Sequence, residues 1–277
     1  MKTLRGKKAL ITGAASGIGR ALALGLAHEG THLILLDIDR PGLDAVAQET
    51  RRFGVDVDTR ICDLRQSAEI SECVADVLAR GGVDILVNNA GVATYGPTEQ
   101  MSEEQWSRVL DVNLLAPIQF VRELLPSLRS RAEAHILNVC SLAGLVATSR
   151  LAAYNVSKFG LQGLSESLRA EFGRTGLGVT SLCPGFAPTN IYEAANRDGS
   201  PQHAAPPSAW IMTTPERIAA RAIRGIRRNQ PIVVITPMAR VLWFLKRLAP
   251  RLFLRLFTES LQQVGHVETA AQAAKGR

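Results

Sequence analysis

The sequence contains little cysteine, and the cysteines it has are scattered. Cys62, Cys73, Cys140 and Cys183 include no Cys-x-x-Cys pair. This pattern excludes a zinc-finger type of site and a disulfide-held scaffold. We therefore predict that the chain holds no metal and belongs in the reducing cytoplasm.

Long apolar runs are also missing. The glycines between residues 13 and 19 interrupt the apolar stretch behind the basic N-terminus, so we predict no secretory signal peptide. Between Met1 and Pro237 no apolar run is long enough to span a bilayer. Hydrophobic residues at 46% and charged residues at 21% are typical of a globular protein with a full core.

Acidic residues are fewer than basic ones, and the net charge is +7. Much of the excess lies between residues 217 and 255, in Arg217, Arg221, Arg224, Arg227, Arg228, Arg240, Lys246, Arg247, Arg251 and Arg255. Such a balance is compatible with nucleic acid or an anionic membrane as partner. No zinc-finger spacing or RNA-binding motif accompanies it, so we expect a solvated face and no nucleic-acid partner.

Short apolar runs alternate with stretches of helical periodicity. Strands are predicted at Lys8–Thr12, His32–Asp37, Asp58–Cys62, Asp84–Asn88, His135–Cys140, Gly178–Cys183 and Pro231–Thr236. Helices are predicted at Gly17–Glu29, Leu43–Phe53, Ser67–Arg80, Ser102–Ser130, Ala153–Gly173 and Pro215–Asn229. Strands that alternate with helices pair in parallel through right-handed crossovers. The predicted fold class is α/β, a doubly wound parallel sheet of about seven strands with helices on both faces and ligands at its carboxyl edge.

A glycine-rich turn follows the first predicted strand. It runs from Thr12 to Gly19, and its glycines, Gly13, Gly17 and Gly19, let backbone N–H groups approach a bound group closely. The helix that begins near Gly17 directs its partly positive N-terminus at the same place, which favours a phosphate. The motif is weak by itself, because glycines also mark ordinary turns.

An acidic residue, Asp37, ends the second predicted strand. A carboxylate there can accept hydrogen bonds from an adenosine ribose. It would also repel a 2′-phosphate, and Ser16 supplies no cation to offset that repulsion. The sequence therefore favours NAD over NADP, although the nearby Arg40 keeps NADP open.

Polar residues follow later strands as well. Asp63 comes after the third predicted strand, and Asn88-Asn89-Ala90-Gly91 closes the fourth. The carboxyl edge of a parallel sheet would bring them near a ligand. Each of these motifs, taken alone, is equally typical of a turn.

Three further residues have the pattern of a proton-transfer site. Ser141 ends the fifth predicted strand, and Tyr154 and Lys158 share one helix face at positions i and i+4. An ammonium within about 4–6 Å favours a phenolate, so we expect a lowered pKa for Tyr154. A lowered pKa would make the phenol usable as an acid and base near neutral pH. By itself, Tyr-x-x-x-Lys is more often a surface pair.

Together these residues resemble the short-chain dehydrogenase/reductase family. The resemblance covers about Gly6 to Pro237 and rests on Thr12 to Gly19, Asp37, Asp63, Asn88 to Gly91, Asn113, Ser141, Tyr154, Lys158, Pro184, Gly185 and Thr189. It implies a single Rossmann-type domain over residues 1–237, dinucleotide-binding and catalytic. Two departures are small: Ala116 stands where glycine is frequent, and Cys140, where serine is frequent, is expected to be a buried small residue.

The resemblance also implies roles. Tyr154 would exchange a proton with the substrate, Lys158 would hold the nicotinamide ribose, Ser141 would orient the substrate oxygen, and Asn113 would hold a water in a proton relay. The implied cofactor-binding residues are Gly13, Ser16, Gly17, Ile18, Gly19, Asp37, Asp63, Leu64, Asn89, Gly91, Tyr154, Lys158, Pro184, Gly185 and Thr189.

Residues 186–213 form a long segment of irregular pattern, which suits a substrate lid. It contains Tyr192 and Trp210, and apolar residues also follow Ser141. These residues favour a small lipophilic alcohol or ketone as substrate. The lone His203 is expected to have a surface or packing role.

Residues 238–263 are predicted to be a basic amphipathic helical extension, split at Pro250, and residues 264–277 a flexible tail. Two interpretations of residues 238–257 remain open. They pack on the substrate pocket or on another subunit, or they make a peripheral membrane contact. Their charges exclude a comfortable transmembrane span.

The sequence thus predicts a reversible NAD-dependent alcohol dehydrogenase or ketoreductase. The resemblance implies a homo-oligomer, a tetramer or dimer built partly from the predicted helices at Ser102–Ser130 and Ala153–Gly173. One alternative is a dinucleotide-sensing protein without turnover. Another is a membrane-associated dehydrogenase of lipid or steroid type.

Overall fold

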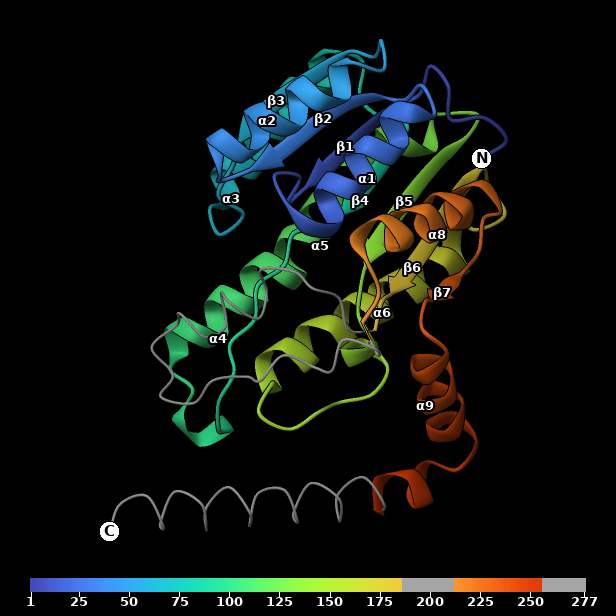
Figure 1. The fold of residues 1–277 in the computed structure, drawn as a ribbon. Coiled ribbons are helices and arrows are strands. Elements are labelled where there is room, and N and C mark those ends of the chain that lie inside the picture. Colours follow the sequence, from blue (N-terminus) through green and yellow to red (C-terminus); the bar gives the residue numbers. More distant parts are fainter. Residues whose placement is uncertain (186–211, 256–277) are drawn as a thin grey trace.

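A parallel sheet of seven strands organises the described residues, 1–185 and 212–255, of this computed structural model (Figure 1). The strand order is β3-β2-β1-β4-β5-β6-β7. The strands are β1 (Lys8–Thr12), β2 (His32–Asp37), β3 (Val57–Ile61), β4 (Ile85–Asn88), β5 (Ala134–Val139), β6 (Leu177–Cys183) and β7 (Ile232–Val234). The predicted doubly wound α/β fold is confirmed.

Helices cover both faces of the sheet. On one side α1 (Gly17–His28) packs against α2 (Arg40–Arg51) and α8 (Pro215–Arg227). On the other, α3 (Ser67–Ala79) packs against α5 (Ala116–Arg129), and α4 (Glu103–Leu110) packs against α6 (Ala152–Phe172). A last helix, α9 (Pro237–Leu248), follows β7 and lies apart from these layers (Figure 1).

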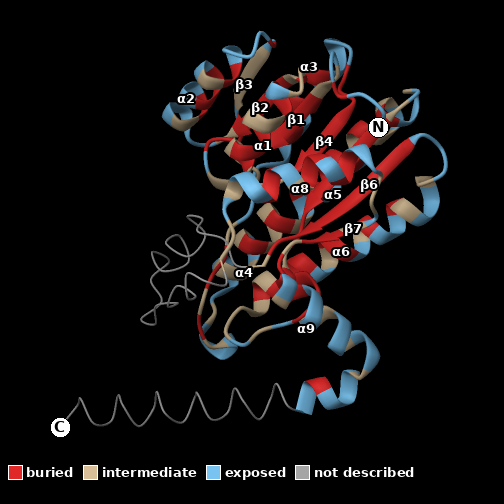
Figure 2. Ribbon diagram, turned by 45° about the vertical axis from the view of Figure 1, so that its right-hand side comes forward, coloured by how far each residue is buried: buried red, intermediate tan, exposed pale blue. Residues whose placement is uncertain are grey.

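Except for the edge strand β3, the strands are largely buried on both faces, which explains why their sequences lack alternation (Figure 2). In β2, Leu33 and Leu35 pack toward α1 and α8, whereas Ile34 and Leu36 pack toward α3 and α5. Each of the four is at most 6% exposed. Transfer of such side chains from water contributes about 1.5–3 kcal/mol each, so the apolar runs fix the sheet at the centre of the fold.

Side-chain caps set several helix starts. Thr214 Oγ1 accepts from Arg217 N at 3.3 Å, with Pro215 in the first turn, as predicted. The prediction that the second helix begins at Leu43 is wrong, because Asp39 Oδ1 accepts from Gly42 N at 3.2 Å and α2 begins at Arg40. The predicted break at Pro250 is confirmed: α9 ends at Leu248, and helical backbone resumes at residue 250.

The predicted uninterrupted helix at Ser102–Ser130 is wrong in its middle. A π-helical turn, η2 (Asp111–Leu115), separates α4 from α5. Such wide turns are rare and frequent at functional sites, and this one contains Asn113. The regular apolar spacing on either side gives no sign of it.

Candidate active site

Residues singled out by the sequence gather at the carboxyl edge of the sheet. The glycine turn leaves β1, Asp37 ends β2, Asn89 follows β4 and Ser141 follows β5. The strand order reverses between β1 and β4, and ligands of open α/β sheets bind at such a switch point. The glycine turn and Asn89 flank it.

A hydrogen-bonded clamp holds the glycine turn in place. Asn89 Nδ2 donates to Thr12 O at 2.9 Å and to Gly13 O at 3.0 Å. Thr12 Oγ1 accepts from the backbone N–H groups of Asn89 and Ala90 at 3.0 and 3.1 Å. The side chain of Asn89 therefore positions the turn, a role that the sequence did not indicate.

The glycines leave no room for side chains. Gly13 has φ +64°, and a Cβ there would lie 2.8 Å from Ala90 Cα. A Cβ on Gly19 would lie 1.9 Å from Gly13 O. Both positions require glycine, because the turn lies directly on the first turn of α1 and on the Asn89 loop.

The N-terminus of α1 has features that suit an anion. Its N-cap residue, Ser16, makes no side-chain capping bond, and no acidic residue occupies the first turn of the helix. Ile18, in that turn, packs against the core. Backbone N–H groups near the N-terminus of α1, together with the helix dipole, suit a pyrophosphate.

Asp37 lies directly beside this turn. Its Oδ2 accepts from Ala15 N at 3.0 Å, while Oδ1 accepts from Ile38 N at 2.8 Å and Asp39 N at 3.2 Å. A partly buried carboxylate thus lies next to the turn, as a ribose-binding role requires.

Asp63 is hydrogen-bonded by Arg65, a residue that the sequence analysis did not single out. Arg65 donates to both of its carboxylate oxygens, with Nη2 to Oδ2 at 2.6 Å. The hydrogen bonds from the Arg65 side chain lower the pKa of Asp63. Leu64 packs on the core beside it. Contact of Asp63 with an adenine stays a prediction.

Asn113 is fully buried in the π-helical turn. Its Nδ2 donates to Val92 O at 2.8 Å and to Ser157 Oγ at 3.1 Å, and its Oδ1 accepts from Val92 N at 2.8 Å. The amide therefore fastens the loop after β4 to α6. The predicted water relay remains untested.

Ser141, Tyr154 and Lys158 come together where β5 ends against α6. Ser141 lies close enough to the Tyr154 phenol to lower its pKa, and Ser141 Oγ accepts from Ala143 N at 3.0 Å. Lys158 Nζ lies 5.7 Å from the centre of the Tyr154 ring and donates to Val139 O at 3.0 Å. A Cβ on Gly91 would lie 3.5 Å from Lys158 Nζ and 3.5 Å from Asn113 Oδ1, so Gly91 borders the same space.

The loop after β6 is described only up to Gly185. Pro184 O accepts from Leu142 N at 2.8 Å, and Gly185 packs so closely on Thr236 that a Cβ would lie 2.6 Å from its Oγ1. Thr189, most of the predicted lid at 186–213, including His203, and the predicted tail lie outside the described residues.

Comparisons with known proteins agree with this geometry. A family model described as short chain dehydrogenase matches residues 7–199. The chain belongs to the short-chain dehydrogenase/reductase family. It is an NAD(P)-dependent oxidoreductase.

Three relatives illustrate the range of this family. Rat estradiol 17-beta-dehydrogenase 11 is 32% identical over 257 residues, which cover 91% of this chain and 83% of the relative. A Burkholderia phymatum short-chain dehydrogenase/reductase in complex with NAD has a TM-score of 0.79 at 28% identity, covering 89% of this chain and 95% of that one. An actinorhodin polyketide ketoreductase variant with NADPH has a TM-score of 0.74 at 29% identity, covering 85% and 97%.

The expected lowering of the Tyr154 pKa is wrong for this dehydrogenase without its cofactor. Burial raises the pKa of Tyr154 to about 12, although the hydrogen bond with Ser141 opposes the rise. Burial also lowers the pKa of Lys158 to about 8, so this lysine still carries its charge at neutral pH. Desolvation of a phenolate outweighs an ammonium 5.7 Å from the ring centre.

The residues fit a nicotinamide dinucleotide. Lys158 is 3% exposed, and among the described residues its ammonium donates one hydrogen bond, to Val139 O. An ammonium has three N–H donors, so two remain to hold ribose hydroxyls. The N-terminus of α1 would hold the pyrophosphate and Asp37 the other ribose.

The Lys158→Met variant is expected to be more stable than the wild type at pH 7 without dinucleotide. The pKa of Lys158 falls from 10.5 to about 8 on folding, which corresponds to a cost of roughly 3 kcal/mol below pH ~8. The cost disappears as the pH rises toward 10.5, because only the unfolded chain then binds the proton. Thermal unfolding of the wild type and the variant at pH 7 and at pH 10 measures their difference in stability at each pH. A variant less stable than the wild type at pH 7 would contradict the cost of burying this charge.

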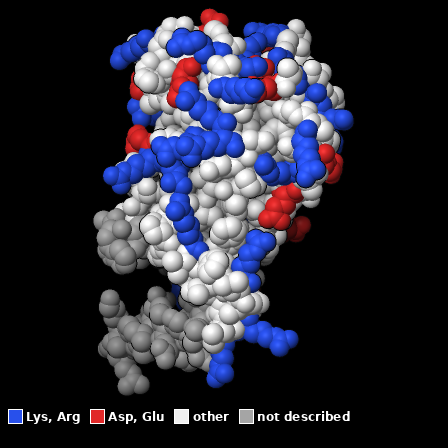
Figure 3. Space-filling model, turned by 90° about the vertical axis from the view of Figure 1, so that its right-hand side faces the viewer, with Lys and Arg blue, Asp and Glu red and all other residues white. Residues whose placement is uncertain are grey.

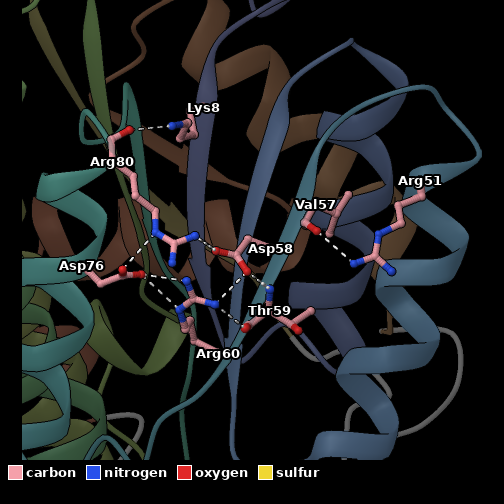
Figure 4. Close-up of polar contacts among 8 residues, drawn as sticks. All are labelled: Lys8, Arg51, Val57, Asp58, Thr59, Arg60, Asp76 and Arg80. Atoms are coloured by element: carbon pink, nitrogen blue, oxygen red, sulfur yellow. Dashed lines mark hydrogen bonds and ion pairs between the residues drawn. The ribbon is translucent and has the colours of Figure 1, made fainter.

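A separate hollow of about 530 Å³ lies at the opposite, amino edge of the sheet, lined by residues that include Lys8, Asp58 and Arg80. The charged side chains beside it form ion pairs with one another (Figure 4). Arg60 donates to Asp58 and Asp76, both at 2.7 Å, and Arg80 donates to Asp76 at 2.9 Å. This network protects the edge strand β3 with charge and forms no part of the active site.

Proposed function

We propose that this dehydrogenase transfers a hydride between a nicotinamide and a hydrophobic secondary alcohol or ketone. The main support is the meeting of the Ser141 hydroxyl, the Tyr154 phenol and the buried Lys158 ammonium beside a glycine turn that suits a dinucleotide. A bound dinucleotide supplies the hydride, and the residues of the chain position the substrate and move the proton.

In the direction of reduction, the hydroxyls of Ser141 and Tyr154 both donate to the carbonyl oxygen of the substrate. With the carbonyl carbon reduced, the phenol proton of Tyr154 would move to that oxygen and leave a phenolate. Lys158 stabilises the phenolate electrostatically. Oxidation of the alcohol reverses each step.

A lipophilic substrate is supported by the residues beyond Ser141. Leu142, Leu145 and Val146 are buried in one apolar cluster there. The printed names of two relatives, an estradiol dehydrogenase and a polyketide ketoreductase, agree with a hydrophobic substrate class.

A dinucleotide sensor without turnover is the second candidate. In its favour, burial raises the pKa of Tyr154, which makes the phenol a poor base for alcohol oxidation without a bound dinucleotide. A panel of hydrophobic alcohols and ketones, assayed at 340 nm with both dinucleotides, tests the two. Turnover supports the dehydrogenase, and dinucleotide binding with no turnover would support the sensor.

We further propose a preference for NAD, because Asp37 lies where it would repel a 2′-phosphate. The Asp37→Asn variant should shift the ratio of kcat/KM for NADP over NAD upward by about 10- to 100-fold. Asp44→Asn removes an exposed carboxylate from α2, the helix that follows Asp37, and should leave the ratio unchanged. An unchanged ratio in Asp37→Asn would show that selection lies elsewhere.

A further inference from the structure

Helix α9 has apolar side chains on two opposite faces. The inner face packs on the body through Met238, Ala239, Leu242 and Trp243. The outer face carries Val241, Phe244, Leu245 and Leu248, spaced i, i+3, i+4 and i+7; we call these four residues the outer stripe. They are 56, 60, 48 and 67% exposed. A surface helix normally has polar residues on its outer face, so the outer stripe is an unusual surface to leave in water.

The charges around the outer stripe have one sign. Between residues 237 and 255 there are five cations and no carboxylate; the cations are Arg240, Lys246, Arg247, Arg251 and Arg255. In Figure 3 the lower end of the molecule, where α9 lies, shows blue and white atoms, and the red carboxylates lie farther up the body. Leu252 and Leu254, 58 and 57% exposed, extend the apolar surface beyond Pro250.

Exposed apolar residues flanked by cations fit some partners better than others. A second copy bound through the same face would bring two sets of cations together, which is unfavourable. An anionic lipid surface offers hydrocarbon for the leucines and phosphate for the arginines. No helix within the described ranges is long and apolar enough to cross a bilayer, so the contact is peripheral. We infer that α9 and residues 249–255 are a docking surface for an anionic membrane.

The docking surface is joined to the active site. Lys246 Nζ donates to Leu145 O at 2.7 Å, in the loop after Ser141, and lies 4.6 Å from the centre of the Phe159 ring on α6. Thr236, which caps α9, packs on Gly185. If the substrate is lipophilic, as in the proposed function, docking brings the active site next to the bilayer in which such a substrate dissolves.

Vesicle co-sedimentation of the full chain tests docking without any enzyme assay. We expect binding to phosphatidylglycerol/phosphatidylcholine vesicles that weakens with salt, and little binding to pure phosphatidylcholine. Leu248→Glu should weaken binding about 100-fold, because it removes apolar area and adds a repelled charge. The double variant Arg247→Gln/Arg251→Gln should weaken it about 30-fold, at about 1 kcal/mol per cation.

Matched controls lie elsewhere on the molecule. Leu78→Glu, at an exposed leucine of α3, and Arg174→Gln/Arg228→Gln, at the amino edge of the sheet, should bind as the wild type does. Circular dichroism verifies that each variant is folded. The inference is overturned if the wild type stays in the supernatant with anionic vesicles, or if Leu248→Glu and its control bind equally. It is also overturned if Leu248→Glu abolishes only a dimer seen by analytical ultracentrifugation.

Discussion

The Tyr154→Phe variant should lose turnover by about 10³-fold, which is within the range for removal of a general acid and base. The phenol is the group that lies with Ser141 where β5 meets α6, and phenylalanine keeps its ring but not its proton. Dinucleotide affinity should be nearly unchanged, because the Lys158 ammonium and the glycine turn remain. Steady-state rates at 340 nm and NADH fluorescence titration measure the two quantities.

The matched control removes the same hydroxyl from another tyrosine. Tyr95→Phe lies in the loop after β4, and we expect it to retain turnover within the same order of magnitude as the wild type. Near-normal rates in Tyr154→Phe would remove this phenol from proton transfer. Equal losses in both variants would point to a general effect of losing a hydroxyl.

The Gly19→Ala variant should lose dinucleotide binding by at least about 100-fold, because a displacement of the turn by about 1 Å is enough to cause a loss of that size. The added Cβ would lie 1.9 Å from Gly13 O and 2.6 Å from Asn89 Nδ2, so the turn and its clamp must move. Isothermal titration with NADH measures the affinity.

Gly163→Ala is the matched control for this substitution. Gly163 lies inside α6, and a Cβ there meets no atom within 4 Å. Alanine should therefore stabilise the helix, by about 0.5–1 kcal/mol, and leave dinucleotide binding unchanged. Wild-type affinity in Gly19→Ala would mean that the turn does not bind the pyrophosphate.

The layout of the site could be predicted from the sequence because parallel strands place their carboxyl ends at one edge. Asp37 and Ser141 each end or follow a buried apolar run, so their positions follow from the strands alone. The spacing of Tyr154 and Lys158 likewise follows from a helix that has few irregularities.

What the sequence did not reveal depends on contacts between distant segments. The side-chain nitrogen of Asn89 donates to the backbone carbonyls of Thr12 and Gly13, 77 and 76 positions away. The π-helical turn around Asn113 is fixed by its bonds to Val92 and Ser157, which no local pattern encodes. The pKa of Tyr154 depends on burial, whereas only the neighbouring charge of Lys158 is visible in the sequence.

We propose that the Tyr154 phenol becomes acidic only beside both the Lys158 ammonium and a bound, positively charged nicotinamide. The most direct test is the phenolate absorbance at ~295 nm, measured as the difference between wild type and Tyr154→Phe. It is recorded from about pH 7 to pH 10, below the ordinary tyrosine pKa of about 10. We predict no phenolate in this range without dinucleotide, since the pKa of Tyr154 is about 12, and a titrating phenolate with saturating NAD⁺. Identical curves with and without NAD⁺ would contradict the account.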